Sequence, residues 1–255
     1  MKPARLVYGV HAVEALLQRH PEHVLELFHD AKRSDTRLRE VLEQATAAGV
    51  ALQAVDRARL DDLVGKANHQ GLVARVRESA AAGETELYAL LDALDEAPMV
   101  LVLDGVQDPH NLGACLRTAD AVGVHAVVTP KDRACGVTPV VRKVASGAAE
   151  SVPVFQVTNL ARVLRELKER GLWLVGMAGE GAADLFEVDL TGPLALVLGA
   201  EEKGLRRLTR ETCDVLARLS MHGAVSSLNV SVAAGVCLYE ARRQRTSRVA
   251  LQTPA

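Results

Sequence analysis

Five polar residues near the middle of the chain could orient and polarise a bound ligand. They are Asp104, Gln107, Asp108, His110 and Asn111. The apolar run 101–103 before them predicts a strand, and apolar residues at helical spacing from Leu112 predict a helix. Because open α/β sheets bind their ligands where a parallel strand ends and a helix begins, this loop is a candidate site.

The helix that follows the loop carries further candidates. The Asn111 side-chain oxygen is suited to cap the helix, Gly113 leaves room for close backbone approach, and Arg117 projects from the second turn. A structural alternative fits this segment equally well. In that alternative Asn111 is only a cap, and Arg117 pairs on the surface with Asp120, three residues later.

Two later loops repeat the pattern of a strand end followed by glycine and polar residues. The first contains Gly199, Glu201 and Gly204, and the second contains Ser227 and Asn229 before another helix. Taken singly, each residue is most simply a turn former, a solvated charge or a helix cap. Three such loops in one domain nevertheless favour a shared site at one edge of the sheet.

The elements that position these loops alternate between strand and helix. Strands are expected near residues 100–103, 125–128, 152–156, 172–175, 194–198 and 215–219. Helices between them imply right-handed crossovers, so the fold class is α/β with a mostly parallel, doubly wound sheet. A nucleotide-dependent oxidoreductase is disfavoured, because the run 176–181 has the wrong spacing for G-x-G-x-x-G.

Residues 1–76 form a separate, smaller α/β pattern. Strands are expected at 24–28, 50–55 and 71–76, and helices at 11–17, at 36–48 and from Asp56 onward. The tripeptide 69–71 is most simply a turn, with ligand contact as the alternative. Residues 77–98 predict a linker with a short acidic docking helix at 84–94. The predicted domains are therefore 1–76 and 99–255, joined by 77–98.

Composition limits the classes of partner. With 255 residues and 49% hydrophobic content, the chain can bury one large core or two small ones. The formal net charge is −2, so any nucleic acid must be held by local basic patches. An aromatic content of only 3% argues against a base-stacking platform.

The cysteines and the hydropathy pattern predict a cytoplasmic protein. Cys115, Cys135, Cys213 and Cys237 are widely spaced and form no C-x-x-C pair, so we expect reduced thiols, with no disulfide framework and no metal site. The N-terminus lacks the apolar core of a signal peptide, and no run approaches the roughly 18 apolar residues of a membrane span.

The three loops together carry a family resemblance. In the runs 111–119, 198–205 and 227–234, the chain resembles the SPOUT superfamily of trefoil-knotted methyltransferases, and more narrowly the TrmH-type RNA ribose 2′-O-methyltransferases. The runs 8–13 and 69–75 are similar to the branch that methylates a guanosine in the peptidyl-transferase loop of bacterial 23S rRNA. The resemblance covers nearly the whole chain, and three ordered motifs are more specific than any single one.

The resemblance implies a fold, a cofactor and partners. We expect a small L30e-like N-terminal domain that binds RNA, followed by a SPOUT domain with a C-terminal trefoil knot that forms a homodimer. The expected substrate is 23S rRNA, and the expected cofactor is S-adenosylmethionine. By position, the cofactor would lie near Gly199, Leu219, Met221 and Leu228, held by backbone groups and apolar walls.

The resemblance also implies catalytic residues, namely Arg117 and Asn111 with support from Glu201, Ser227 and Asn229. A ribose 2′-hydroxyl is weakly acidic, so the enzyme must align its oxygen with the methyl group and favour the alkoxide. The arginine of the first motif has been proposed as the general base in relatives. Because a guanidinium titrates above about 12, our hypothesis is that Arg117 grips the adjacent phosphate and stabilises negative charge on the oxygen.

RNA binding would depend on local basic residues. The candidates are Arg5, Arg75, Arg77, Lys131, Arg133, Arg142, Lys143, Arg206, Arg207, Arg210, Arg242, Arg243, Arg245 and Arg248. Two alternative functions are a tRNA ribose 2′-O-methyltransferase and a non-catalytic RNA-binding factor in ribosome assembly. The N-terminal resemblance favours 23S rRNA over tRNA, and the complete set of methyl-transfer residues disfavours a pure binder.

Overall fold

The structure is a computed structural model that describes residues 4–65, 67–77, 82–201 and 203–252. The chain divides into two compact units. The first consists of Met1–Ala80 with Ser146–Ser151, and the second of Ala81–Ala145 with Val152–Ala255. Each unit has its own hydrophobic core, so each is described by itself. None of the described helices is long and apolar enough to cross a membrane.

The first unit contains a four-stranded sheet in the order β1-β4-β2-β3. Its strands are β1 Ala4–Tyr8, β2 Val24–Asp30, β3 Ala51–Val55 and β4 Leu72–Arg77. Strand β4 is antiparallel to β1 and β2, while β2 and β3 are parallel, so β1, β2 and β3 run in one direction. Strand β1 is absent from the sequence prediction, because its sequence ARLVY ends in three consecutive apolar residues and shows no clear alternation.

A helix follows each of these three parallel strands. The helices are α1 Val10–Arg19, α2 Thr36–Ala47 and α3 Arg57–Val64, with a short 3-10 turn η1 at Pro21–His23. Asp35 and Asp56 cap α2 and α3 by accepting backbone N–H bonds of 3.2 and 2.8 Å. The predicted starts of these two helices are thus confirmed.

The second unit is built on a seven-stranded sheet in the order β7-β6-β5-β10-β8-β11-β9. Its strands are β5 Met99–Asp104, β6 Ala126–Pro130, β7 Val154–Val157, β8 Trp173–Met177, β9 Ala183–Asp184, β10 Leu194–Gly199 and β11 Val215–Arg218. All neighbouring strands in this sheet are parallel, which confirms the predicted α/β class. The two-residue edge strand β9 was not predicted.

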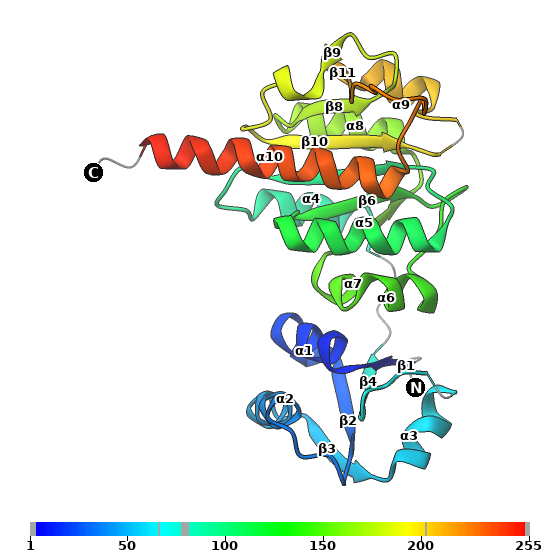
Figure 1. Ribbon diagram of the computed structural model, residues 1–255. Coiled ribbons are helices and arrows are strands. Elements are labelled where there is room, and N and C mark those ends of the chain that lie inside the picture. The colour runs from blue at the N-terminus through cyan, green and yellow to red at the C-terminus, as the bar shows by residue number, and fades with distance from the viewer. Residues whose placement is uncertain (1–3, 66, 78–81, 202, 253–255) are drawn as a thin grey trace. The chain divides into compact units, whose positions relative to one another are not determined.

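Helices cover both faces of this sheet, as Figure 1 shows. They are α4 Glu84–Asp92, α5 Pro109–Val122, α6 Pro139–Ala145, α8 Leu160–Glu169, α9 Arg207–Thr212 and α10 Val230–Gln252, with a 3-10 turn η2 at Leu185–Glu187. The short α7, Ala148–Ser151, belongs to the first unit. Leu87 and Leu91 of α4 are buried with α8 against Val100 and Val102 of β5. Helices α5 and α10 lie side by side on the other face. Because β5, β10 and β8 are parallel neighbours, their carboxyl ends lie at the same edge of the sheet.

Candidate functional site

A cavity of about 170 Å³ lies at this edge of the second unit, where β8, β10 and β11 end. Its walls are Met177, Ala178, Gly179, Leu198, Gly199, Ala200, Glu201, Gly204, Arg218, Leu219, Met221, Ser226, Ser227, Leu228, Val230 and Ala233. Six of the predicted site residues line it: all four predicted cofactor contacts, together with Glu201 and Ser227. Mostly apolar walls with a few polar groups are typical of a small-molecule site.

Three polar side chains from distant loops form a chain of hydrogen bonds beside the cavity. The Asn229 Nδ2 donates to Asn111 Oδ1 at 3.0 Å, and the Asn111 Nδ2 donates to Glu201 Oε1 at 2.6 Å. The chain of donors thus ends at the Glu201 carboxylate, to which Asn111 donates directly. Glu201 Oε2 accepts no hydrogen bond from the residues that the structure describes, so one carboxylate oxygen remains for a ligand.

Asn229 combines this contact with a structural role. Its Oδ1 accepts the Ser231 backbone N–H at 2.9 Å and the Ser231 hydroxyl at 2.6 Å, which caps the start of α10. The cap that the sequence suggested for Asn229 is therefore present, and it leaves the amide group free to donate toward Asn111. One residue both starts the helix and joins the polar chain.

Asn111 does not cap α5, contrary to the sequence expectation. The helix begins at Pro109, and Asp108 is its cap, with Oδ1 accepting the His110 N–H at 2.8 Å. Proline at the first helical position explains this shift, since it lacks the N–H that would need a partner there. Asn111 lies inside the first turn, and its amide is therefore available to Glu201 and Asn229.

Close backbone approaches fix the shape of the loops. A Cβ atom added to Gly199 would lie 2.0 Å from the carbonyl carbon of Gly204. Ala200 and Gly204 pair through two backbone hydrogen bonds of 2.9 and 3.2 Å, which fold the loop back over the end of β10. Gly113 likewise allows α6 to approach, because a Cβ there would lie 2.7 Å from the Val144 Cβ. Glycine is therefore required at both positions.

The buried Asp104 anchors the same loop to β5. Its carboxylate accepts the Arg206 backbone N–H at 3.0 Å and the Arg206 Nε at 2.5 Å. Arg206 is an RNA-contact candidate, and this bond gives it a structural role in addition. The charge pair ties the end of β5 to the start of α9.

Arg117 is exposed on α5 and does not line the cavity. Within the described parts of the chain, its side chain forms no hydrogen bond or ion pair, so the Asp120 pairing is not present. Met177, Ala178 and Gly179, at the end of β8 and just after it, form a cavity wall that was not predicted from the sequence. The glycines of the run 176–181 were the available signal, since glycine at a strand end often marks close backbone approach.

Several RNA-contact candidates also have partners within the protein. Arg245 donates to the carbonyl oxygens of Ala97, Pro98 and Gly192 at 2.6–3.0 Å, and Arg242 donates to that of Val122. Burial lowers the pKa of Arg245 below its ordinary value. Ion pairs occupy other candidates, namely Arg75 with Glu26, Arg207 with Glu211, Arg210 with Glu180 and Arg243 with Glu240. The Arg248 side chain lies outside the described residues.

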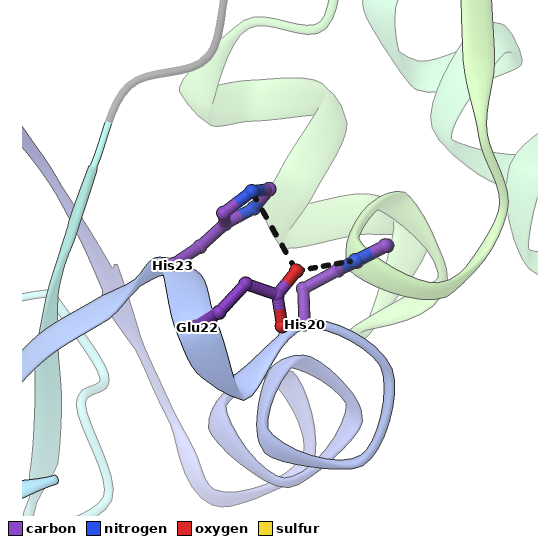
Figure 2. A group of neighbouring side chains, drawn as sticks. All are labelled: His20, Glu22 and His23. Carbon is purple, nitrogen blue, oxygen red and sulfur yellow. Dashed lines mark ion pairs between the residues drawn. The ribbon is translucent and has the colours of Figure 1, made fainter.

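A surface cluster in the first unit brings three potential metal ligands together (Figure 2). The Glu22 Oε1 lies 3.4 Å from His20 Nδ1 and 3.7 Å from His23 Nε2. The two imidazole rings are stacked, with centroids 5.3 Å apart and an interplanar angle of 16°. The three side chains contact one another at the protein surface, where such groups commonly occur without an ion, so no metal site is assigned to them.

Two family descriptions match the chain. Residues 98–239 match the SpoU rRNA Methylase family, and residues 6–82 match the description RNA 2′-O ribose methyltransferase substrate binding. The chain is 54% identical to the 23S rRNA (guanosine-2′-O-)-methyltransferase RlmB of Shewanella oneidensis, over 97% of this chain and 100% of that protein. It is 56% identical to the RlmB of Vibrio cholerae, over 94% of this chain and 97% of that protein.

A solved structure gives the same answer for the fold. The SpoU methyltransferase AviRb from Streptomyces viridochromogenes, in complex with the cofactor AdoMet, superimposes with a TM-score of 0.77 at 28% identity, covering 96% of this chain and 91% of that one. The similarity spans both units. The chain belongs to the SpoU rRNA methylase family of RNA ribose 2′-O-methyltransferases.

Proposed function

We propose that this protein transfers a methyl group from S-adenosylmethionine to the ribose 2′-hydroxyl of a guanosine in 23S rRNA. The observation that carries the proposal is the polar chain from Asn229 through Asn111 to Glu201 beside a largely apolar cavity. The RlmB relatives are named for this reaction. A position in the peptidyl-transferase loop and action in the cytoplasm remain predictions from the family resemblance.

The cavity residues fit the proposed cofactor. Leu198, Leu219 and Leu228 offer apolar surface for an adenine ring, and the exposed backbone beside Gly199 offers donors and acceptors. When bound, the cofactor supplies an electrophilic methyl group on a sulfonium. The Glu201 carboxylate is then the nearby negative charge that favours a cationic ligand in this cavity.

The roles of the polar residues follow from their contacts. Asn111 orients the Glu201 carboxylate, and Asn229 orients Asn111 while it caps α10. Ser227 lies in the cavity wall, where its hydroxyl can donate to a ligand. Arg117 is exposed, and we propose that it grips an RNA phosphate and stabilises negative charge on the 2′-oxygen.

We further propose that the protein acts as a homodimer through α10 and the loop before it. Val232 and Tyr239 lie two turns apart on this helix and are 52% and 57% exposed, and Leu228 of the preceding loop is 38% exposed. The opposite side of α10 is buried, through Ala234, Cys237 and Leu238 among others. An exposed apolar stripe on an otherwise polar surface favours association. Light scattering of the purified protein tests this proposal.

The deciding experiment is methyl transfer from isotopically labelled S-adenosylmethionine, with 23S rRNA and tRNA offered separately and the modified nucleotide mapped. We expect a single 2′-O-methylguanosine in 23S rRNA. Transfer to tRNA alone would instead support the tRNA-modifying alternative, and uptake of the cofactor without transfer to any RNA would support a binding factor.

The role of Arg117 is tested by the pH dependence of the rate in Arg117→Lys and Arg117→Ala. If Arg117 binds a phosphate through two parallel hydrogen bonds, Arg117→Lys should recover little of the methyl-transfer rate, because lysine lacks the planar guanidinium group. If lysine restores most of the rate, a point charge suffices and the proposed role is wrong.

A further inference from the structure

A second cavity, of about 400 Å³, lies in the first unit and plays no part in the site described above. Arginines dominate its lining, namely Arg33, Arg37 and Arg57, and Asp30 is its one carboxylate. The Asp30 Oδ1 accepts the Lys32 backbone N–H at 2.9 Å. The lining therefore carries a net positive charge, which favours an anionic ligand.

The topology of the first unit explains why positive charge collects here. Strands β1, β2 and β3 run in one direction, and α1, α2 and α3 begin just after them, so three helix N-termini share one edge of the sheet. Arg57 is the first residue of α3, and Arg37 is the second residue of α2. Helix N-termini and guanidinium groups both favour anions, so the two effects add at this edge.

Existing contacts hold two of the guanidinium groups in place without using all their donors. The Arg37 Nη2 lies 2.8 Å from His11 Nδ1 and donates to Glu14 Oε2 at 3.1 Å. Arg33 donates to Asp35 and to the Gln70 carbonyl. Within the described part of the chain, Arg57 has no hydrogen-bond or ion-pair partner, and neither Nε nor Nη1 of Arg37 is used. These donors remain for a ligand.

Two motifs that the methyl-transfer site leaves unexplained meet at this cavity. The run 8–13 contributes Val10, whose N–H donates to Gln70 Oε1 at 3.1 Å, and the run 69–75 contributes Gln70 and Gly71. Gly71 has a φ of 71°, and a Cβ there would lie 3.0 Å from the Arg33 Cδ. The two motifs therefore shape the cavity and position an arginine in it.

We propose that this cavity binds a backbone phosphate of the RNA substrate, with Arg37 and Arg57 as its principal contacts. The proposal rests on the proposed RNA methyltransferase function and adds a discrete anchoring point within the first unit. Arginine is well matched to phosphate, because its planar fork donates two parallel hydrogen bonds to phosphate oxygens. The lining contains no Phe, Tyr or Trp, and its one ring, that of His11, is already in contact with Arg37 Nη2 at 2.8 Å, so the phosphate backbone is the expected target.

The test compares two double variants of the full-length protein that remove the same charge. Arg37→Gln with Arg57→Gln alters the cavity, and Arg39→Gln with Arg59→Gln alters exposed positions two residues later on the same helices, outside its lining. Binding to a 23S rRNA fragment is measured by fluorescence anisotropy at several salt concentrations. Thermal unfolding and calorimetric uptake of S-adenosylmethionine report whether each variant is folded.

We expect the cavity variant to bind RNA about tenfold or more weakly, with a salt dependence reduced by roughly one to two phosphate contacts, while the control variant stays close to wild type. Equal losses in both variants would mean diffuse attraction and would overturn the proposal. So would equal retention of affinity. Calorimetric binding of inorganic phosphate is measured on the same two variants. Loss of phosphate binding in the cavity variant with unchanged RNA affinity would assign the cavity to free phosphate and also overturn the proposal.

Failure of the proposed function gives a different result. If the wild-type protein methylates no RNA but the cavity variant alone loses RNA affinity, the anchoring site stands and the methyl-transfer proposal fails. If the wild type methylates 23S rRNA and the two variants bind RNA equally well, the methyl-transfer proposal stands and the anchoring site fails.

Discussion

Asn229 is the residue in which structural and chemical roles are most closely combined. Its side-chain oxygen caps α10, and its amide group donates to Asn111, which in turn donates to Glu201. Sequence reasoning treated the cap and the site as rival explanations, yet both hold at once, because the oxygen and the nitrogen of one amide serve different partners. The two roles can be separated by substitution.

Asn229→Asp keeps an oxygen for the cap but replaces the donor to Asn111 with a second acceptor. We expect the free energy of unfolding to change by less than about 0.5 kcal/mol, and methyl transfer to fall at least tenfold. Asn229→Ala removes the cap too, and we expect it to lose about 1 kcal/mol of stability as well as activity. Urea unfolding and single-turnover rates measure the two effects. An active Asp variant would show that the polar chain is dispensable.

At the scale of elements, the site depends on how closely backbone segments approach one another. The loop after β10 folds back so that Gly204 lies against Gly199, and a side chain at Gly199 cannot be accommodated without moving this backbone. Gly199→Ala should therefore destabilise the protein by about 3 kcal/mol or displace the loop. Either result should abolish calorimetric uptake of S-adenosylmethionine.

Gly192→Ala is the matched control, since nothing lies within 4 Å of a Cβ added there. It should change stability by less than about 1 kcal/mol and leave uptake of the cofactor intact. Normal uptake by Gly199→Ala would mean that the approach to Gly204 does not define the cofactor site.

Arg245 is one of the residues that fasten the long helix α10 to the sheet. Arg245 donates to backbone carbonyls before β5 and β10, which ties the helix to the start of both strands. Arg245→Met keeps the aliphatic stem and removes the donors, so we expect a loss of about 2 kcal/mol, because buried carbonyls lose charged partners. Arg207→Met, in an exposed pair with Glu211, should cost less than about 0.5 kcal/mol. Equal effects in urea unfolding would refute the fastening role.

At the scale of the whole molecule, buried thiols link stability to alkaline pH. Burial raises the pKa of Cys115, Cys213 and Cys237 to about 12, whereas the unfolded chain loses these protons near pH 8.5. Above that pH the unfolded state binds fewer protons than the folded state, so the free energy of unfolding must fall as pH rises. Urea unfolding between pH 8 and 10 should show this decline.

Cys237→Ala removes one of the three linked protons and should make the decline shallower. Lysine and tyrosine titrations are common to both proteins, so the difference between them isolates the thiol. If the free energy of unfolding falls equally steeply with pH in wild type and variant, the pKa of the Cys237 thiol is not raised by folding.

The sequence by itself determined the α/β class, the six main strands of the second unit and the loops that carry the chemistry. These features depend on local periodicity and on residue types at strand ends, which are visible along the chain. The expected cap at Asn111 was wrong, although Pro109 marks the first position of α5 and so indicates Asp108 as the cap.

Only the tertiary structure decided which polar groups meet. The bond between Asn111 and Glu201 joins residues 90 positions apart, and Asn229 joins from 118 positions beyond Asn111. The tertiary structure also distinguished two kinds of arginine. Arg242 and Arg245 donate hydrogen bonds to backbone carbonyls of other segments, whereas Arg37 and Arg57 line a cavity. The physical reason is that charge and residue type are local properties, whereas burial and hydrogen-bond partners arise from how distant segments pack.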